Sequence, residues 1–195
     1  QAAPFERQAL IKLRHIAGDA ALGKKVEAHR DGFVYSGSPW DLAVALDLRR
    51  QQVKQLVEPG QINLKHSHGG IVTLEYAIQY LQVMHGHRHP SLRTPNTLRA
   101  LAALIDVGLI PRTTGENLRK SYLFIRMLID GLRMVRGNTK DLVIPPPDSD
   151  EFIFLARRIG YQTEDWQAGA RHLRTDIEEH MKQNRQFFEK MFGKL

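Results

Sequence analysis

The sequence contains no cysteine, which excludes disulfide bonds and thiolate chemistry. It also lacks the run of roughly 20 apolar residues that a membrane-spanning helix needs. No charged segment followed by an apolar stretch opens the chain, so we expect no secretion signal. Together these absences favour a cytoplasmic protein that does not enter a membrane.

Aromatic residues make up 8% of the 195 residues, and no run of them alternates with basic residues as in a single-strand binding surface. The net charge of +7 can attract a nucleotide, a nucleic acid or an acidic protein. Because the lysines and arginines are spread over most of the chain, the sequence disfavours nucleic-acid binding.

Convincing β-strand patterns are also missing. The apolar stretches 33–35 and 143–144 are too short to build a sheet. Elsewhere apolar residues recur at helical spacing, which predicts an all-α protein, a helical bundle of about seven helices with no substantial sheet. A first helix is expected over Phe5 to Arg14, and the later helix starts are Asp19, Ser38–Pro39, Gly69–Gly70, Thr94–Pro95, Thr113 or Thr114, Asp148 and Thr163.

Three consecutive prolines at 145–147 interrupt the helical pattern. They mark a candidate hinge before the last two helices. A single continuous domain with a rigid loop at this point is the simpler interpretation, and the sequence favours it.

The segment 63–82, NLKHSHGGIVTLEYAIQYLQ, carries the strongest functional signal. Lys65 precedes Gly69–Gly70, which open a helix with Glu75 and Gln79 one turn apart. Amides at a helix start are unpaired and lie at the positive end of the helix dipole, and glycine lets a ligand approach them, so a phosphate could bind here. Spacing alone favours a loop-to-helix turn in which glycine only supplies backbone freedom.

Four blocks in the same order resemble the glutamine synthetase adenylyltransferase family. The segment 63–82 is similar to the family's lysine–Gly-Gly–Asp-Ile-Glu block, and residues 5–19 are similar to its Trp-Glu-Arg-Gln-Ala-Leu block. Residues 89–108 resemble the following helix pair, and residues 121–161 resemble the closing part of a half-enzyme. The resemblance therefore spans nearly the whole chain.

The chain also departs from the family pattern. Val72 and Thr73 stand where the family block has arginine and aspartate, Ser67–His68 stand where Gly-Pro is common, and Phe5 replaces a tryptophan. Thr73 removes a charge that could bind a cation or an arginine, which puts full activity in doubt.

The resemblance implies a helical domain that follows a nucleotidyltransferase domain, with residues 1–20 as a lead-in from that catalytic domain and 21–195 as the bundle. It implies AMP transfer from ATP to glutamine synthetase, or AMP removal, with Mg²⁺ as cofactor and the nitrogen-regulatory PII protein as a partner. It places eight residues at the nucleotide cleft. They are Arg7, Lys12 and Arg14 near phosphate, Lys65, Gly69 and Gly70 on the opposite wall, Glu75, which could orient a basic residue or a metal-bound water, and Gln79 on the same polar stripe of the helix. A surface cluster of basic residues and a glutamate that only stabilises its helix are the alternatives that stay open.

The catalytic carboxylates of such enzymes, an Asp-x-Asp pair after a Gly-Ser turn, have no counterpart in this sequence. Asp148 and Asp150 follow prolines at a helix start, where capping explains them. We therefore assign no catalytic residue and no metal ligand, treat the histidines at 66, 68, 85, 87 and 89 as loop residues, and expect no tightly bound cofactor. The isolated chain is expected to be inactive.

Two other functions stay open. A stand-alone module could bind proteins through apolar stripes, with Trp166 and Phe187–Phe188 as contacts. A basic helical nucleic-acid binder is the second alternative, and its affinity would decrease steeply with salt.

Overall fold

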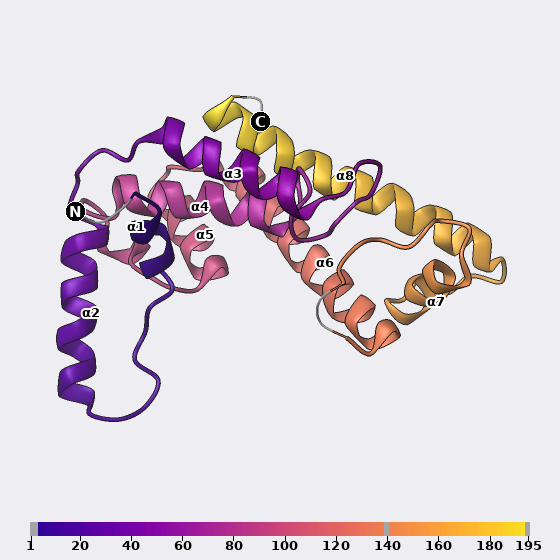
Figure 1. Ribbon diagram of the computed structural model, residues 1–195, viewed down its shortest axis with the longest axis horizontal. Helices are drawn as coiled ribbons and strands as arrows, with labels where there is room; N and C mark the ends of the chain where they lie inside the picture. Colours follow the sequence, from indigo (N-terminus) through magenta and orange to yellow (C-terminus); the bar gives the residue numbers. More distant parts are fainter. Residues whose placement is uncertain (1–3, 139–140, 194–195) are drawn as a thin grey trace. The chain divides into compact units, whose positions relative to one another are not determined.

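The computed structural model describes residues 4–138 and 141–193, and within them eight α-helices and one short 3-10 helix form the fold (Figure 1). They are α1 (Pro4–Leu10), α2 (Ala20–Val34), α3 (Leu42–Leu56), α4 (Ile71–His85), η1 (Pro90–Leu92), α5 (Thr97–Asp106), α6 (Arg112–Arg136), α7 (Asp150–Arg158) and α8 (Trp166–Phe192). The described residues form no strand, and Asn63 and Val143 meet in an isolated bridge. The all-α prediction is confirmed, with eight α-helices rather than about seven.

Short polar side chains start most of these helices, but the capping residue is often a neighbour of the one expected. Asp19 caps α2 as predicted and accepts the amide of Leu22 at 2.9 Å. The helix expected at Pro39 begins only at Leu42, because Asp41 accepts two first-turn amides at 3.0 and 3.2 Å. The N-caps of α5, α7 and α8 are Asn96, Ser149 and Asp165, one or two residues after the expected Thr94–Pro95, Asp148 and Thr163.

The chain divides into two compact units. Unit 1 comprises Gln1–Leu48 and Glu75–Glu116, and unit 2 comprises Arg49–Leu74 and Asn117–Leu195. The triproline segment lies inside unit 2, and residues 1–20 belong to unit 1. The assignment of 1–20 to an upstream catalytic domain stays a prediction.

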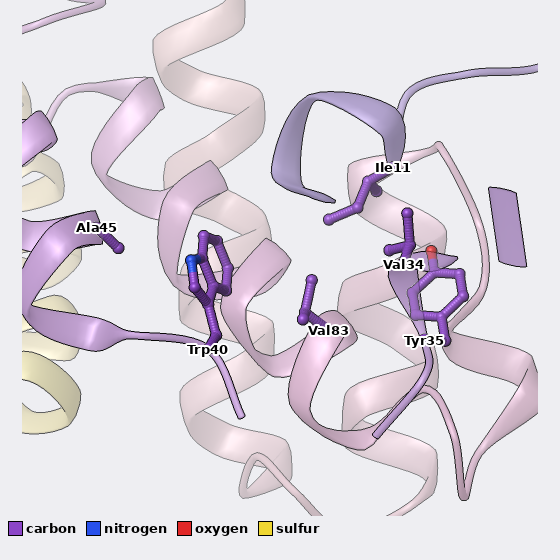
Figure 2. Packing of buried hydrophobic residues seen from close by; sticks show 6 residues of the cluster. All are labelled: Ile11, Val34, Tyr35, Trp40, Ala45 and Val83. Atoms are coloured by element: carbon purple, nitrogen blue, oxygen red, sulfur yellow. The ribbon is translucent and has the colours of Figure 1, made fainter. Parts of the chain in front are cut away.

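Unit 1 is built around a small apolar cluster from α2, α4 and the segments beside them (Figure 2). Its members are Ile11, Val34, Tyr35, Trp40, Ala45 and Val83. Trp40 also stacks on the ring of Tyr80 with 5.8 Å between centroids. This cluster holds the end of α2 and the start of α3 against α4.

In unit 2, α7 packs beside α8, and the double-glycine bend before α4 also lies against α8 (Figure 1). Gly69 has a φ of +88°, and a Cβ added there would overlap the carbonyl oxygen of Met181 and lie 2.8 Å from its carbonyl carbon. The amide nitrogen Nδ2 of Asn184 donates to the carbonyl oxygen of Gly69 at 3.0 Å. Glycine is therefore required here by close packing as well as by the backbone angle.

No helix within the described ranges combines the length and the apolar character that crossing a bilayer requires.

Gly69→Ala should lower the free energy of unfolding by about 3 kcal/mol, because it adds a backbone clash to the cost of a positive φ. Gly60→Ala is the matched control, since Gly60 has a φ of +79° and open space around it. The control should cost only about 1 kcal/mol. Urea unfolding followed by circular dichroism measures both values, and equal losses would rule out the close contact with α8.

Candidate functional site

The amides of the double-glycine bend are all occupied by acceptors from the same loop or the first turn of α4. The bonds are Gly69 N to Thr73 Oγ1 (3.1 Å), Gly70 N to Ser67 O (2.8 Å), Ile71 N to Leu64 O (3.0 Å) and Val72 N to Lys65 O (3.2 Å). The expectation of unpaired amides at this helix start is therefore wrong. It fails because the preceding loop folds back and supplies the acceptors, which leaves these four amides unavailable to a phosphate.

Arg49, on α3, holds this loop from inside unit 2. Its side chain is fully buried, and Nη2 donates to the carbonyl oxygen of His66 at 2.8 Å and to Thr73 Oγ1 at 3.1 Å. Nη1 donates to Gln52 Oε1 at 3.0 Å. Sequence analysis missed Arg49, although its position one helical turn after the buried Ala45 was a signal for burial.

Arg7 has a structural role in place of the expected phosphate contact. Arg7 is 8% exposed, and its guanidinium donates to the carbonyl oxygen of Val34 at 2.9 Å and to that of Ser38 at 3.0 Å. Burial lowers the pKa of the guanidinium. Because the bond to Val34 satisfies the last carbonyl of α2, and the bond to Ser38 ties down the segment after that helix, Arg7 stabilises unit 1.

Three of the predicted residues gather in a polar cluster within unit 1. Lys12 Nζ donates to Thr97 Oγ1 at 2.8 Å, and the Thr97 hydroxyl lies 3.5 Å from a carboxylate oxygen of Glu75. Gln8 Nε2 donates to Gln79 Oε1 at 2.7 Å, one turn further along α4. Thr97 and Gln8 are members of this cluster that sequence analysis did not find, since only the packing of α1 and α5 brings them to α4.

The electrostatics of this cluster centre on Lys12. Burial lowers the pKa of its ammonium group, and the negative charge of Glu75 opposes that effect. Because Lys12 lies beside a carboxylate and a hydroxyl, its side chain is already ordered. It can therefore bind an anionic group of a ligand without the entropy cost of ordering a flexible side chain.

The remaining predicted cations are exposed. Arg14 borders a shallow hollow of about 440 Å³ in unit 1, and Lys65 lies on the surface of unit 2. Arg7, Lys12, Arg14, Glu75 and Gln79 thus belong to unit 1, whereas Lys65, Gly69 and Gly70 belong to unit 2. Their expected position on opposite walls of one cleft stays a prediction.

Residues 4–138 and 141–193 hold no group of three or more histidine, aspartate or glutamate side chains that could bind a metal ion. The Ser121 hydroxyl donates to the carbonyl oxygen of His180 at 3.0 Å and also contacts His180 Nδ1 at 3.0 Å. Ser121 is fully buried, so this pair joins α6 to α8 and is not a nucleophile–base arrangement.

A sequence model of the GlnD PII-uridylyltransferase family matches residues 44–192. The chain belongs to this family. The matched range begins in the first turn of α3 and ends at the last residue of α8, so it includes the buried Arg49, the double-glycine bend and Glu75.

Curated relatives named bifunctional glutamine synthetase adenylyltransferase/adenylyl-removing enzyme match most of the chain, which confirms the resemblance seen in the sequence. The protein from Mycobacterium tuberculosis (strain ATCC 25618 / H37Rv) is 36% identical over 157 residues, which cover 78% of this chain and 16% of the relative. The Mycobacterium leprae protein is 35% identical over 176 residues, with 88% and 16% covered. The Corynebacterium glutamicum protein is 33% identical over 177 residues, with 87% and 17% covered. The chain thus spans about one sixth of the length of these relatives.

His66 should make the stability of the protein depend on pH. Burial, together with the positive charges of Lys65 and Arg49, lowers the pKa of His66 to about 4, below the value of about 6.5 expected in the unfolded chain. Between these two values the unfolded state binds the proton and the folded state does not. The contribution of His66 is therefore fully present above pH 6.5 and is lost as the pH is lowered toward 4.

The change to test is His66→Gln, measured as urea unfolding at a series of pH values. The variant should lose less stability than the wild type between neutral pH and pH 4, whereas His29→Gln, at an exposed position, should follow the wild type. The pKa values of His68, His85 and His180 are also lowered, mainly by burial, so part of the pH dependence should persist. Identical pH dependence in all three proteins would contradict the role of His66.

Proposed function

We propose that this chain is a helical part of a nucleotidyltransferase that transfers AMP from ATP to glutamine synthetase, or removes it. The observation that carries the proposal is the match of most of the chain to enzymes named for that activity. Since the chain spans only about one sixth of those proteins, the chemistry of the whole enzyme is part of the proposal.

The polar cluster of unit 1 supports a nucleotide-facing role. In this proposal the positive charge of Lys12 contacts a phosphate of the nucleotide. Thr97 Oγ1 and the carbonyl oxygen of Pro95 accept from the ammonium group and hold it in place, and Glu75 in turn contacts Thr97. The exposed Arg14 and Lys65 are the other candidate contacts. Gln79 is buried and accepts from Gln8, so it acts indirectly. Arg7 and the amides of Gly69 and Gly70 act indirectly, because they stabilise the parts that carry those side chains.

Mg²⁺ is a proposed cofactor of the enzyme, but the described residues do not fit it as a ligand set. Its carboxylate ligands are therefore proposed to lie in another part of the enzyme. We also propose, from the family resemblance, that the nitrogen-regulatory PII protein is a partner and that the enzyme works in the cytoplasm.

The chain on its own should transfer no AMP, because its sequence offers no Asp-x-Asp pair in the setting that nucleotidyltransferases use. The assay mixes the purified chain with glutamine synthetase, Mg²⁺ and radiolabelled ATP, with a complete adenylyltransferase as positive control. If the chain alone transferred AMP to glutamine synthetase, the proposal that the catalytic carboxylates lie in another part of the enzyme would be wrong.

Lys12→Met in the complete enzyme should lower the rate of AMP transfer at least about tenfold, which corresponds to the loss of one charged contact to the reacting nucleotide. Lys65→Ala should also weaken the reaction. Lys25→Met is the control, since Lys25 is an exposed lysine of α2 outside the cluster. Circular dichroism should show all variants folded, and wild-type turnover in Lys12→Met would remove Lys12 from the site.

A further inference from the structure

Unit 2 contains an apolar groove that the proposed nucleotide chemistry does not use. It has a volume of about 720 Å³ and runs between the C-terminal end of α3, the loop at 57–62 and α8. We name it the α3–α8 groove. Its apolar lining residues are Val53, Val57, Ile62, Ile177 and Met181. Ile62 is 37% exposed, and Leu56, on the last turn of α3, is 49% exposed.

Basic side chains stand on both sides of this apolar surface. Lys54 lies on the α3 side, and Lys182 and Arg185 lie on the α8 side. All three are exposed, and none makes an ion pair or a side-chain hydrogen bond with any described residue. Three positive charges are therefore available to a ligand in the groove.

The groove has fewer unpaired negative charges than positive ones. The Glu178 carboxylate is paired with Arg174 at 2.9 Å, and Glu58 is the remaining lining carboxylate. The pKa of His68 is lowered, by burial first and then by Arg49 and Arg185. The groove is thus apolar with a net positive edge, which is complementary to an apolar ligand with acidic groups.

Two other occupants fit less well. A nucleotide phosphate would find no open amide at the adjacent Gly69–Gly70 bend, because those amides are bonded within the loop. A second copy of this chain carries a net charge of +7 and would bring like charge to a basic edge.

We propose that the α3–α8 groove binds an amphipathic helical segment of a protein partner, with apolar side chains in the groove and acidic side chains against Lys54, Lys182 and Arg185. The lining positions of α8 run from Ile177 to Arg185 and extend along about 12 Å of helix axis, which matches two turns of a bound helix. This interaction is independent of the nucleotide function proposed above.

The first test uses a short fluorescein-labelled peptide with leucine at every third or fourth position and glutamate between, and a second peptide in which lysine replaces each glutamate. Fluorescence anisotropy with the full chain measures both affinities. The acidic peptide should bind at least about tenfold more tightly, and its affinity should decrease with salt. Equal affinities for the two peptides would overturn the proposal.

Variants locate the binding surface. Lys182→Glu/Arg185→Glu should weaken binding of the acidic peptide about tenfold, and Lys54→Glu should weaken it from the opposite side. Arg119→Glu/Lys120→Glu is the matched control, since it makes the same charge change at exposed positions of α6 outside the groove. The control should change the affinity by less than about twofold. Equal losses in the two double variants would show nonspecific attraction to a basic protein and would contradict the proposal.

The apolar part has its own test. Ile62→Ser should weaken binding while leaving the salt dependence of the affinity unchanged, because it removes apolar contact and no charge. ATP and single-stranded RNA are tested as competitors of the bound peptide. If either one displaces it at a lower concentration than the unlabelled acidic peptide does, the groove binds nucleotides or nucleic acid. If the chain associates with itself, and if Lys182→Glu/Arg185→Glu abolishes that association, the groove binds a second copy of the chain. Either result would overturn the proposal.

Discussion

The buried guanidinium of Arg49 is the interaction on which the loop before α4 depends. A buried charge is costly unless hydrogen bonds satisfy it, and here the carbonyl oxygen of His66 and the hydroxyl of Thr73 accept from it. These bonds hold the loop in a conformation in which its own carbonyl oxygens, together with the Thr73 hydroxyl, accept from the amides at the start of α4. With those amides satisfied internally, Gly69 can pack directly against the backbone of α8.

Thr73 shows how a departure from the family pattern fits this arrangement. Its Oγ1 accepts from Arg49 and from the amide of Gly69, so a neutral side chain satisfies two buried donors where the family block has aspartate. The double-glycine bend therefore serves packing in this chain. In the function that we propose, the cluster of Lys12, Glu75 and Thr97 faces the nucleotide, and the basic-edged groove of unit 2 is the proposed surface for a protein partner.

Local sequence signals predicted the helical class, the helix after Gly69–Gly70, and the shared face of Glu75 and Gln79, because these depend on residues a few positions apart. Helix starts shifted by one to three residues where several capping side chains are adjacent, as at Ser38 and Asp41. The site was harder to predict. Arg7 donates to carbonyl groups that lie more than twenty positions away in the chain, and Gly69 packs against the equally distant backbone of α8. No local sequence pattern predicts contacts between such distant residues.

Hydrogen exchange of the Gly70 and Ile71 amides, followed by NMR in the wild type and in Arg49→Met, tests most directly whether the buried arginine holds the bend closed. Both amides should be protected in the wild type, because Ser67 and Leu64 accept from them at 2.8 and 3.0 Å, and protection should decrease selectively at these two amides in the variant. Exchange at the rate of an unstructured chain in the wild type, or unchanged protection in a folded Arg49→Met variant, would contradict that role.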